Sequence, residues 1–408
     1  MSQSDNTRIS AGNKGILIIV ENLPVPFDRR VWQEATALRA AGYPVSVICP
    51  TGKGHDAAYE EIDGIHIYRH PLPIEASGAV GFLIEYSAAL FWEFVLSLRV
   101  RRRHGFDAIH ACNPPDLIFL VGLFHKLLFG RKFLFDHHDI SPELFEAKFD
   151  RRGVLHWLLG IFEKLTFRAA DVGIATNETF RQIAIKRGGM RADRVWVVRS
   201  FPDLGRFQRR DPDPRHKKGR EHLIGYVGIM ARQDGVDNLV RGMAHIVQQQ
   251  GRSDIQCQII GDGPELSNLI ALADELGVSE YIDFPGYVSG EDLLTRLSTL
   301  DVGVIPDPYN SYNDKISMNK VFEYLALGIP TVMYDLEEGR VAAGEAARVA
   351  SEHSPEGLAA VITELTDDPE ARRHMSDWGR AHAAENFSWE KEKHALLEAY
   401  ETLFRDVR

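Results

Sequence analysis

The sequence predicts an α/β protein of two doubly wound, Rossmann-like domains that face each other across a cleft. Three observations support this prediction. The chain has 408 residues, which at about 150 residues per domain is enough for two or three domains. Apolar runs of strand length alternate with helical stretches in two successive series. A charged, proline-containing stretch without apolar periodicity separates the two series.

The first domain is predicted to span residues 15–202, after a polar tail at 1–14 that we expect to be disordered. It opens with the β-branched run Ile16–Val20, which is typical of a strand buried on both faces of a parallel sheet. Val31–Gly42 has helical spacing and ends in a glycine suited to a helix C-terminus. Further strands are expected at 45–49, 65–68, 108–111, 133–136, 172–176 and 195–198.

The second domain is predicted to span 221–385, after a linker at 203–220. Its first helix is expected from about Val236. A helix at 386–408 closes the chain and could pack back on the first domain. Strands are expected at 222–228, 255–263, 281–286, 302–306 and 331–335. Ligands of such sheets bind outside the carboxyl ends of the strands, so we expect the functional site there.

Composition excludes some functions. With 47 basic and 58 acidic side chains the formal net charge is −11, which opposes non-specific binding of the whole chain to a nucleic acid. The three cysteines, Cys49, Cys112 and Cys257, are odd in number and far apart, which indicates a reducing compartment. The first residues contain no apolar run typical of a secretory signal. A cytoplasmic location is therefore expected.

The most informative segment is the helix predicted at 318–327, with Ser317 as its N-cap and Gly328 at its end. Lys320 and Glu323 are three residues apart and share a face. Unpaired N–H groups, the helix dipole and an ammonium suit a diphosphate, and a carboxylate suits the hydroxyls of a ribose. The alternative is a surface Lys/Glu pair on an amphipathic helix.

A family resemblance favours the first interpretation. Five segments of the second domain carry it: GYVGIMARQDGVDNLV, IIGDGPELSNL, DFPGYV, DVGVIP and NDKISMNKVFEYLALGIPTVMYD. In this order they resemble the second domain of retaining glycosyltransferases of family 4, which have the two-domain GT-B fold. Near the start, LPVPFDRRVWQEATALRAAGYPVSVICP and HACNPPD extend the resemblance over most of the chain.

The resemblance implies a retaining hexosyltransferase that uses a nucleotide-diphosphate sugar, most simply a UDP-sugar, with no metal ion and no other cofactor. Glu323 matches the second glutamate of the family's Glu-x7-Glu motif. Together with Lys320 and His138 it forms the predicted catalytic set. The predicted donor-binding residues are Gly228, Arg232, Gln233, Gly261, Gly263, Tyr287, Val288, Lys315, Ser317, Asn319, Glu338, Gly339 and Arg340.

Several of these residues have plainer interpretations. Gly261 and Gly263 leave room for a ligand near the backbone, or simply form a tight turn between strand and helix. The stretch at 286–288 resembles one that contacts the base through main-chain groups. The stretch at 338–340 follows a strand end, where a solvated acidic loop is the alternative to a donor contact.

The sequence also departs from the family pattern. Lys315 stands where the first glutamate is expected, and Ile229 and Asp234 stand where an arginine and a lysine for the phosphates are expected. The glycine-rich turn after the first strand is replaced by NLPVPFDRR. Since Lys315 and Lys320 flank the predicted donor helix, we interpret the departures as a move of positive charge to that helix.

In the first domain, His138 matches the histidine that the family places on this side of the cleft, with His137 as the alternative. Adjacent side chains on an extended chain point in opposite directions, so the two are not expected to share a metal. The string Asp211-Pro-Asp213 is assigned no ligand role. The predicted acceptor-binding residues are Asp28, Arg29, Asn113, Asp116, Asp139 and Glu143. Each of these could instead be a capping or turn residue.

The resemblance implies retention of the anomeric configuration, and no carboxylate in the sequence stands out as a nucleophile. Retention could proceed through a nucleophilic carboxylate or through attack of the acceptor on the face that the diphosphate leaves. By resemblance to the family we favour the second route, with the diphosphate helping to deprotonate the acceptor hydroxyl. Without a metal, lysines and the helix N-terminus would stabilise the leaving group.

A membrane surface is the predicted location. The stretch Ala79–Leu98 is apolar except for a stripe that continues to Arg101 and contains Glu85, Glu93 and Ser97, so a transmembrane span is not expected. The basic cluster Arg99–His104 follows, and two further apolar stretches lie at 116–130 and 155–165. We expect peripheral binding at the cytoplasmic face of the inner membrane, and the alternative is three core helices.

The acceptor implied is a lipid-linked or growing saccharide in the synthesis of a cell-surface or exopolysaccharide. One rival function is that of a nucleotide-sugar epimerase, which can share this fold and needs no acceptor. The other is a non-catalytic scaffold that binds the donor, suggested by Lys315 in place of an acid.

Overall fold

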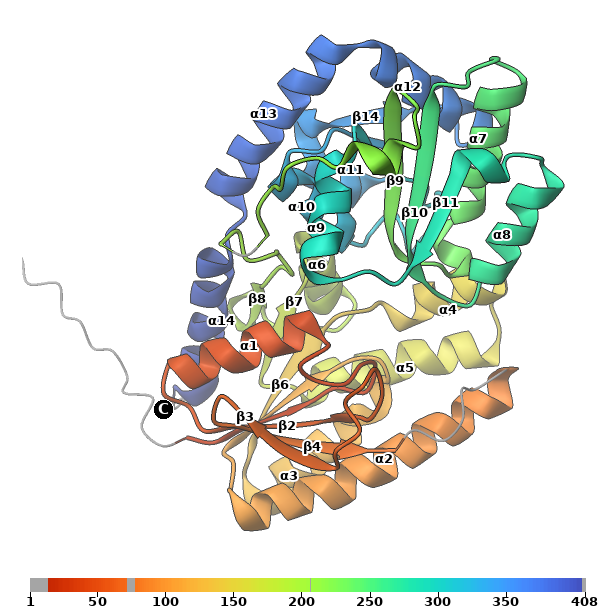
Figure 1. Ribbon diagram of the computed structural model, residues 1–408. Coiled ribbons are helices and arrows are strands. Elements are labelled where there is room, and N and C mark those ends of the chain that lie inside the picture. The colour runs from red at the N-terminus through yellow and green to blue at the C-terminus, as the bar shows by residue number, and fades with distance from the viewer. Residues whose placement is uncertain (1–13, 72–77, 206, 406–408) are drawn as a thin grey trace, which may run out of the picture. The chain divides into compact units, whose positions relative to one another are not determined.

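The computed structural model describes residues 14–71, 78–205 and 207–405, so most of the predicted tail lies outside the described residues. The chain forms two compact units, each built on its own sheet (Figure 1). The first unit takes in the chain up to Phe145, Arg151–Arg199 and the chain from Glu392. The second takes in Glu146–Asp150 and Ser200–Lys391. The predicted fold class of two parallel-sheet α/β domains is confirmed.

The first unit contains an eight-stranded sheet in the order β3-β4-β2-β1-β5-β6-β7-β8. Its strands are β1 (Ile16–Ile19), β2 (Val45–Pro50), β3 (Tyr59–Ile62), β4 (Ile65–His70), β5 (Ala108–Cys112), β6 (Lys132–His137), β7 (Val172–Ala175) and β8 (Val195–Val197). All neighbours are parallel except β3 and β4. The edge strand β3 was not predicted, because it alternates exposed and half-buried residues and has no apolar run.

Helices cover both faces of this sheet. The helices of the first unit are α1 (Arg29–Ala40), α2 (Gly78–Arg103), α3 (Phe119–Phe129), α5 (Val154–Ala169) and α6 (Glu178–Lys186), with single turns η1 (Asp116–Ile118) and η2 (Ala192–Arg194). Helices α4 (Ser141–Phe149) and α14 (Trp389–Phe404) belong to it in part, up to Phe145 and from Glu392. Figure 1 shows α1 on one side of the strands and α2 with α3 on the other. The sheet is therefore doubly wound, as parallel connections require.

The second unit contains a six-stranded sheet in the order β11-β10-β9-β12-β13-β14. Its strands are β9 (His222–Ile229), β10 (Ile255–Asp262), β11 (Ile282–Gly286), β12 (Val302–Ile305), β13 (Thr331–Tyr334) and β14 (Ala347–Ala350), all parallel. In chain order this arrangement is 3-2-1-4-5-6, with the topological switch point between β9 and β12. Ligands of such sheets bind at this point, beyond the carboxyl ends of the strands.

The helices of the second unit are α7 (Val236–Gln248), α8 (Leu266–Glu275), α9 (Gly290–Thr299), α10 (Asn319–Leu327), α11 (Glu337–Ala343), α12 (Pro355–Asp367) and α13 (Pro369–Asn386). Single turns are η3 (Pro214–Lys217), η4 (Arg232–Asp234), η5 (Ser279–Tyr281) and η6 (Gly344–Ala346). One apolar cluster contains residues of α7, α8 and α12, and another contains residues of α9, α10 and α11. Both faces of the second sheet are therefore buried.

The segments predicted as linker and closing helix pack closely on these units. In the segment 203–220, Arg210 pairs with Glu291 at 2.6 Å and Lys217 with Asp301 at 2.8 Å, both within the second unit. A charged composition suggested a free linker, but these charges are paired on the surface of the second unit. At the other end, residues of α14 from Glu392 onward belong to the first unit.

Candidate active site

The helix predicted to bind the donor is α10, and it begins one residue later than expected. Met318 has an extended backbone, with φ −72° and ψ 127°, and is the N-cap in place of Ser317. The Ser317 hydroxyl instead donates to the carboxylate of Glu338, at 3.4 Å. The prediction of Ser317 as the N-cap was wrong because a serine side chain does not fix the boundary when the following loop packs elsewhere.

Lys320 lies in the first turn of α10 and is buried. Its Nζ donates to both carboxylate oxygens of Asp307, at 3.0 and 2.8 Å, and lies 4.7 Å from the centre of the Tyr226 ring. Burial acts to lower the pKa of Lys320, but the carboxylates of Asp307 and Asp234 outweigh it and hold that pKa above its ordinary value. The ammonium is therefore retained, with much of its charge already neutralised.

Asp234 adds a second acid to this cluster. Its carboxylate accepts from the backbone N–H of Ala231 at 3.0 Å and so caps η4. Burial is the main reason that the pKa of Asp234 is raised to about 6, and the ammonium of Lys320 opposes this rise. At this place the family resemblance leads one to expect a lysine for the phosphates. Positive charge at the start of α10 is thus smaller than the sequence suggested.

The glycines at the ends of β9 and β10 bring the two strands together. A Cβ atom on Gly261 would lie 1.8 Å from the carbonyl oxygen of Gly228, and one on Gly263 would lie 2.4 Å from that of Met230. Both glycines have positive φ, at 141° and 159°. The close approach that these glycines permit is between neighbouring segments of backbone, which neither a ligand contact nor a strand-to-helix turn had anticipated.

The other predicted donor residues follow the carboxyl ends of the parallel strands. Arg232 and Gln233 follow β9, Tyr287 and Val288 follow β11, and Glu338, Gly339 and Arg340 lie in α11 after β13. Lys315 and Asn319 precede or begin α10, and the side chain of Glu323 is half-buried on the same helix. Parallel strands end at one edge of a sheet, so the structure gathers these residues there.

Two residues of this edge were missed by the sequence analysis. Asp307 comes two residues after β12 and is 1% exposed. Asn313 is equally buried, and its Nδ2 donates to the carbonyl oxygens of Gln233 and Pro308, at 2.9 and 2.8 Å. An acid directly after an apolar strand was the available signal for Asp307. No local pattern identified Asn313, because its partners lie in another loop.

In the first unit, His138 joins a buried ionic cluster. Arg30 of α1 binds Asp136 of β6 through Nε and Nη2, at 3.0 and 2.7 Å, and its Nε lies 2.9 Å from His138 Nε2. His138 also contacts Asp136 directly. Burial would raise the pKa of Asp136, but Arg30 and His138 hold it well below its ordinary range.

The geometry separates the two candidate histidines. The ring of His137 is 1% exposed and packs against Phe180 and Phe167, with ring centres 4.9 and 5.0 Å apart. The side chain of His138 is 13% exposed. Only His138 therefore keeps a surface that a ligand could touch.

Most of the predicted acceptor residues hold the protein together. Asn113 Oδ1 accepts from the backbone N–H groups of His138 and Asp139, at 2.8 and 3.2 Å, and its Nδ2 donates to Asp116. The Asp28 carboxylate caps α1 by accepting from the Val31 N–H, at 3.0 Å.

Glu143 pairs with Arg187 at 2.7 Å. The side chain of Arg29 is exposed and that of Asp139 is half-buried, so these two remain the most accessible of the predicted set.

Asp136 also belongs to a group that combines three metal-ligand types. His110, Cys112 and Asp136 offer ligand atoms within 4.8 Å of one another, and all three are buried. Both oxygens of Asp136 are already bound by the Arg30 guanidinium, and a cation there would compete with a metal ion. The residues therefore do not fit a metal site. The Asp213 carboxylate caps η3 and pairs with Arg215.

Two family models match the chain. The model described as "Glycosyl transferase 4-like domain" matches residues 28–200, and the model described as "Glycosyl transferases group 1" matches residues 207–382. Between them they cover most of both units.

Curated relatives agree with these models. The chain is 29% identical over 357 residues to the MMP alpha-(1->4)-mannosyltransferase of Mycolicibacterium hassiacum, which is 82% of each chain. It is also 29% identical over 191 residues to the D-inositol 3-phosphate glycosyltransferase of Corynebacterium jeikeium, which is 45% of this chain. The chain spans 44% of the length of that second relative.

Solved structures share the fold. Sucrose-phosphate synthase from Thermosynechococcus elongatus superimposes with a TM-score of 0.77 at 18% identity, covering 96% of this chain and 99% of that one. HepE from Anabaena, solved with UDP and glucose, superimposes with a TM-score of 0.70 at 16% identity, covering 95% of this chain and 100% of that one. WaaG, a glycosyltransferase involved in lipopolysaccharide biosynthesis, superimposes with a TM-score of 0.69 at 15% identity, covering 96% of this chain and 100% of that one.

Proposed function

The chain belongs to the group 1 glycosyltransferases and has their GT-B fold; from this premise we propose that it transfers a sugar from a nucleotide-diphosphate donor to a saccharide acceptor with retention of configuration. One observation carries the proposal. The predicted donor residues follow the carboxyl ends of the parallel strands of the second sheet or lie on α10 and in the loop before it, and Ser317 contacts Glu338. We take the donor to be a UDP-sugar, since the related structure of HepE was solved with UDP and glucose.

In this proposal the diphosphate lies against the N-terminus of α10, where backbone N–H groups and the helix dipole favour an anion. Lys320 contributes less than a free ammonium would, because Asp307 shares its charge. Glu323 accepts hydrogen bonds from the ribose hydroxyls. Stabilisation of the departing diphosphate then comes mainly from preorganised N–H groups and from Lys315, with no metal ion.

The acceptor proposed is a lipid-linked or growing saccharide of a cell-surface polysaccharide, at the cytoplasmic face of the inner membrane. His138 would position the acceptor or donor sugar, since it is the least buried member of the Arg30–Asp136 cluster. The acceptor hydroxyl attacks the face that the diphosphate leaves, and the diphosphate takes its proton. Among the helices of the described residues, none has the length and apolarity needed to cross a bilayer.

A donor-binding scaffold is the second candidate. The neutralised Lys320 and the presence of Lys315 in place of an acid favour it. Incubation with UDP-sugars and a lipid extract separates the candidates. A glycosylated lipid supports the transferase, an epimerised nucleotide sugar supports an epimerase, and donor binding without turnover supports the scaffold.

The donor site itself is tested by Glu323→Gln. We expect UDP affinity to fall about tenfold, because the substitution removes a charge-assisted hydrogen bond. Isothermal titration calorimetry measures the change, with Glu337→Gln, an exposed acid on α11, as the matched control. Unchanged affinity in the Glu323 variant would place the donor elsewhere.

A further inference from the structure

Helix α2 buries two polar side chains together with Ala89, Leu96 and Val100, and it exposes large apolar side chains on its opposite side. Glu93 and Ser97 are 0% exposed, and Ser97 bonds His125 of α3 at 2.9 Å. On the opposite side Phe91 is 62%, Val95 41% and Leu98 38% exposed. The side chain of Glu85 lies outside the described residues. A helix on the surface of a water-soluble domain normally has charged and polar residues on its outer face.

The apolar surface continues over two neighbouring helices. α3 contacts both α2 and α5, and the three lie along one face of the first sheet. We call their outward faces the three-helix surface. On it Leu127 is 74%, Leu128 62% and Trp157 63% exposed. Ten of the sixteen large apolar side chains exposed among the described residues belong to these three helices, so the apolar area is concentrated rather than scattered.

The charge of the three-helix surface has one sign. Within the described side chains of α2, α3 and α5, the carboxylates are those of Glu93 and Glu163, and both are 0% exposed. The exposed charged groups are arginines and lysines, although the whole chain has a net charge of −11. Cationic and apolar groups together fit an anionic lipid surface. They oppose pairing with a second copy, which would bring like charges together.

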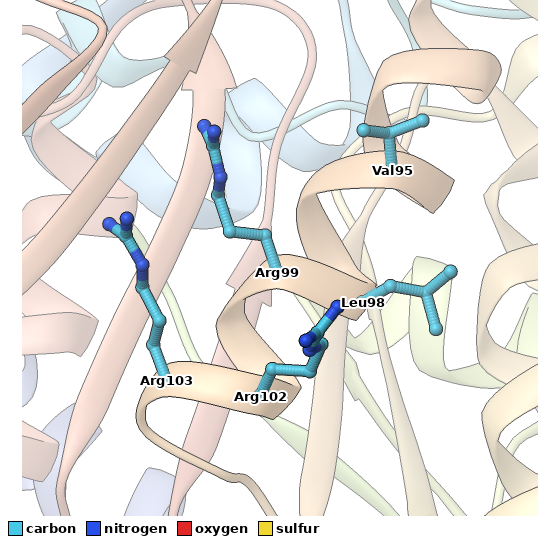
Figure 2. Close-up of a pocket in the computed structure, with 5 residues that line it drawn as sticks. All are labelled: Val95, Leu98, Arg99, Arg102 and Arg103. Carbon is cyan, nitrogen blue, oxygen red and sulfur yellow. The ribbon is translucent and has the colours of Figure 1, made fainter.

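The strongest concentration of charge is a shallow notch of about 480 Å³ on α2, lined by Arg99, Arg102, Arg103, Val95 and Leu98 (Figure 2). Figure 2 shows Arg99 and Arg103 extending to the same side of the helix. Among the described residues, these three arginines have no ion-pair partner. Arg101 differs, because its guanidinium lies over the Phe129 ring at 3.5 Å.

We propose that the three-helix surface docks on a membrane rich in anionic phospholipid, with its apolar side chains in the headgroup boundary and the arginines of the notch on lipid phosphates. The proposal names the surface that brings the membrane-bound acceptor of the proposed function to the enzyme, and it rests on that function. Apolar side chains and cations act together here, and neither class alone is expected to give stable binding.

The test is co-sedimentation of the full chain with vesicles of phosphatidylcholine containing 30% phosphatidylglycerol, against vesicles of pure phosphatidylcholine. Reversal of Arg99, Arg102 and Arg103 to Glu is expected to weaken binding about 100-fold or more, given roughly fivefold per cation. A control with the same change in net charge reverses Arg39, Lys186 and Arg373, exposed cations away from the three-helix surface. We expect the control to bind like the unmodified protein.

A second pair of variants tests the apolar contribution. Leu127→Ser with Trp157→Ser is expected to weaken vesicle binding at least tenfold. The control Ile270→Ser with Val341→Ser changes apolar residues of the second unit that are 41% and 68% exposed, and it is expected to leave binding unchanged. Circular dichroism and UDP titration on every variant report folding and donor binding separately. Loss of UDP binding with vesicle binding intact would overturn the proposed donor site. It would not contradict the docking proposal.

Equal binding of the arginine variant and its control would overturn the docking proposal, as would equal binding to both vesicle types. Sedimentation velocity tests whether a second copy of the chain binds the three-helix surface instead. A dimer that the Leu127 and Trp157 substitutions dissociate, in a protein that ignores vesicles, would assign the surface to a second copy and overturn the proposal.

Discussion

At the scale of single residues, the donor site depends on which charges are already paired. Lys320 and Asp307 form a buried ion pair in the first turn of α10. Removing one partner of such a pair leaves an uncompensated buried charge, whereas replacing both with apolar residues is often neutral. This difference allows a structural role of Lys320 to be separated from a role in donor binding.

We expect Lys320→Met to lower the free energy of unfolding by about 3 kcal/mol and to weaken UDP-sugar binding. The double variant Lys320→Met with Asp307→Leu is expected to regain most of the stability but not the affinity. Denaturant unfolding and calorimetric titration of both variants measure the two effects. Recovery of affinity in the double variant would show that Lys320 acts only by compensating Asp307.

The buried carboxyl group of Asp116 is expected to make the stability of the protein depend on pH. Burial raises the pKa of Asp116 to about 7, with the nearby Glu163 adding to the rise, whereas an exposed aspartate titrates near 4. The unfolded chain therefore releases this proton first. The contribution of Asp116 to stability is fully present below pH 4 and is lost as the pH rises to about 7, with a slope of at most about 1.4 kcal/mol per pH unit.

Asp116→Asn is expected to flatten the fall in stability between pH 4 and 7, because the amide does not ionise and can still bond Asn113. Urea unfolding at several pH values measures the free energy of unfolding of the variant and of the unmodified protein over this range. A variant that loses stability over this range as steeply as the unmodified protein would show that Asp116 is not the titrating group.

At the scale of elements, some predicted site residues are already used to cap a helix. Their side chains are then bound to backbone N–H groups. The Asp28 carboxylate bonds the first turn of α1, whose Arg30 holds the Asp136 cluster. Asp28 therefore acts on the Asp136 cluster through the position of a helix, and a contact with an acceptor is a separate prediction.

Asp28→Ala is expected to cost about 1 kcal/mol of stability, whereas Asp28→Asn, an equally good cap, costs little. The Asn variant then isolates any contact with the acceptor. A raised KM for the acceptor in Asp28→Asn, with stability unchanged, would indicate such a contact, and kinetics that match the unmodified protein would indicate a cap alone.

At the scale of the whole molecule, the first unit is built from both ends of the chain. Tyr400 of α14 is fully buried, bonds His110 of β5 at 2.9 Å and lies 5.7 Å from Tyr43, measured between ring centres. The core of the first unit therefore includes the last helix, although almost all of the second unit lies between that helix and the rest of the first unit in the sequence.

Tyr400→Ala is expected to destabilise the first unit by about 3–5 kcal/mol, since it leaves a large cavity and an unpaired histidine nitrogen. Guanidinium unfolding measures this, with His394→Ala, an exposed residue of the same helix, as the control. Equal stability of the two variants would mean that α14 contributes little to the first unit.

The sequence by itself determined the fold class and the position of helix α10, to within one residue. Runs such as Ile16–Ile19 and Val302–Ile305 are local signals of strands buried on both faces, and the structure contains them with few changes of boundary. The short, half-exposed β3 was missed because it lacks such a run.

Only the tertiary structure decided the partners of the charged residues. Lys320 meets Asp307, 13 residues away, and Arg30 meets Asp136, 106 residues away. Which side of α2 is buried was likewise decided by the sheet and by α3. Local periodicity shows that a stripe exists, but which side is buried depends on what the fold places against it, because burial is a property of neighbours distant in sequence.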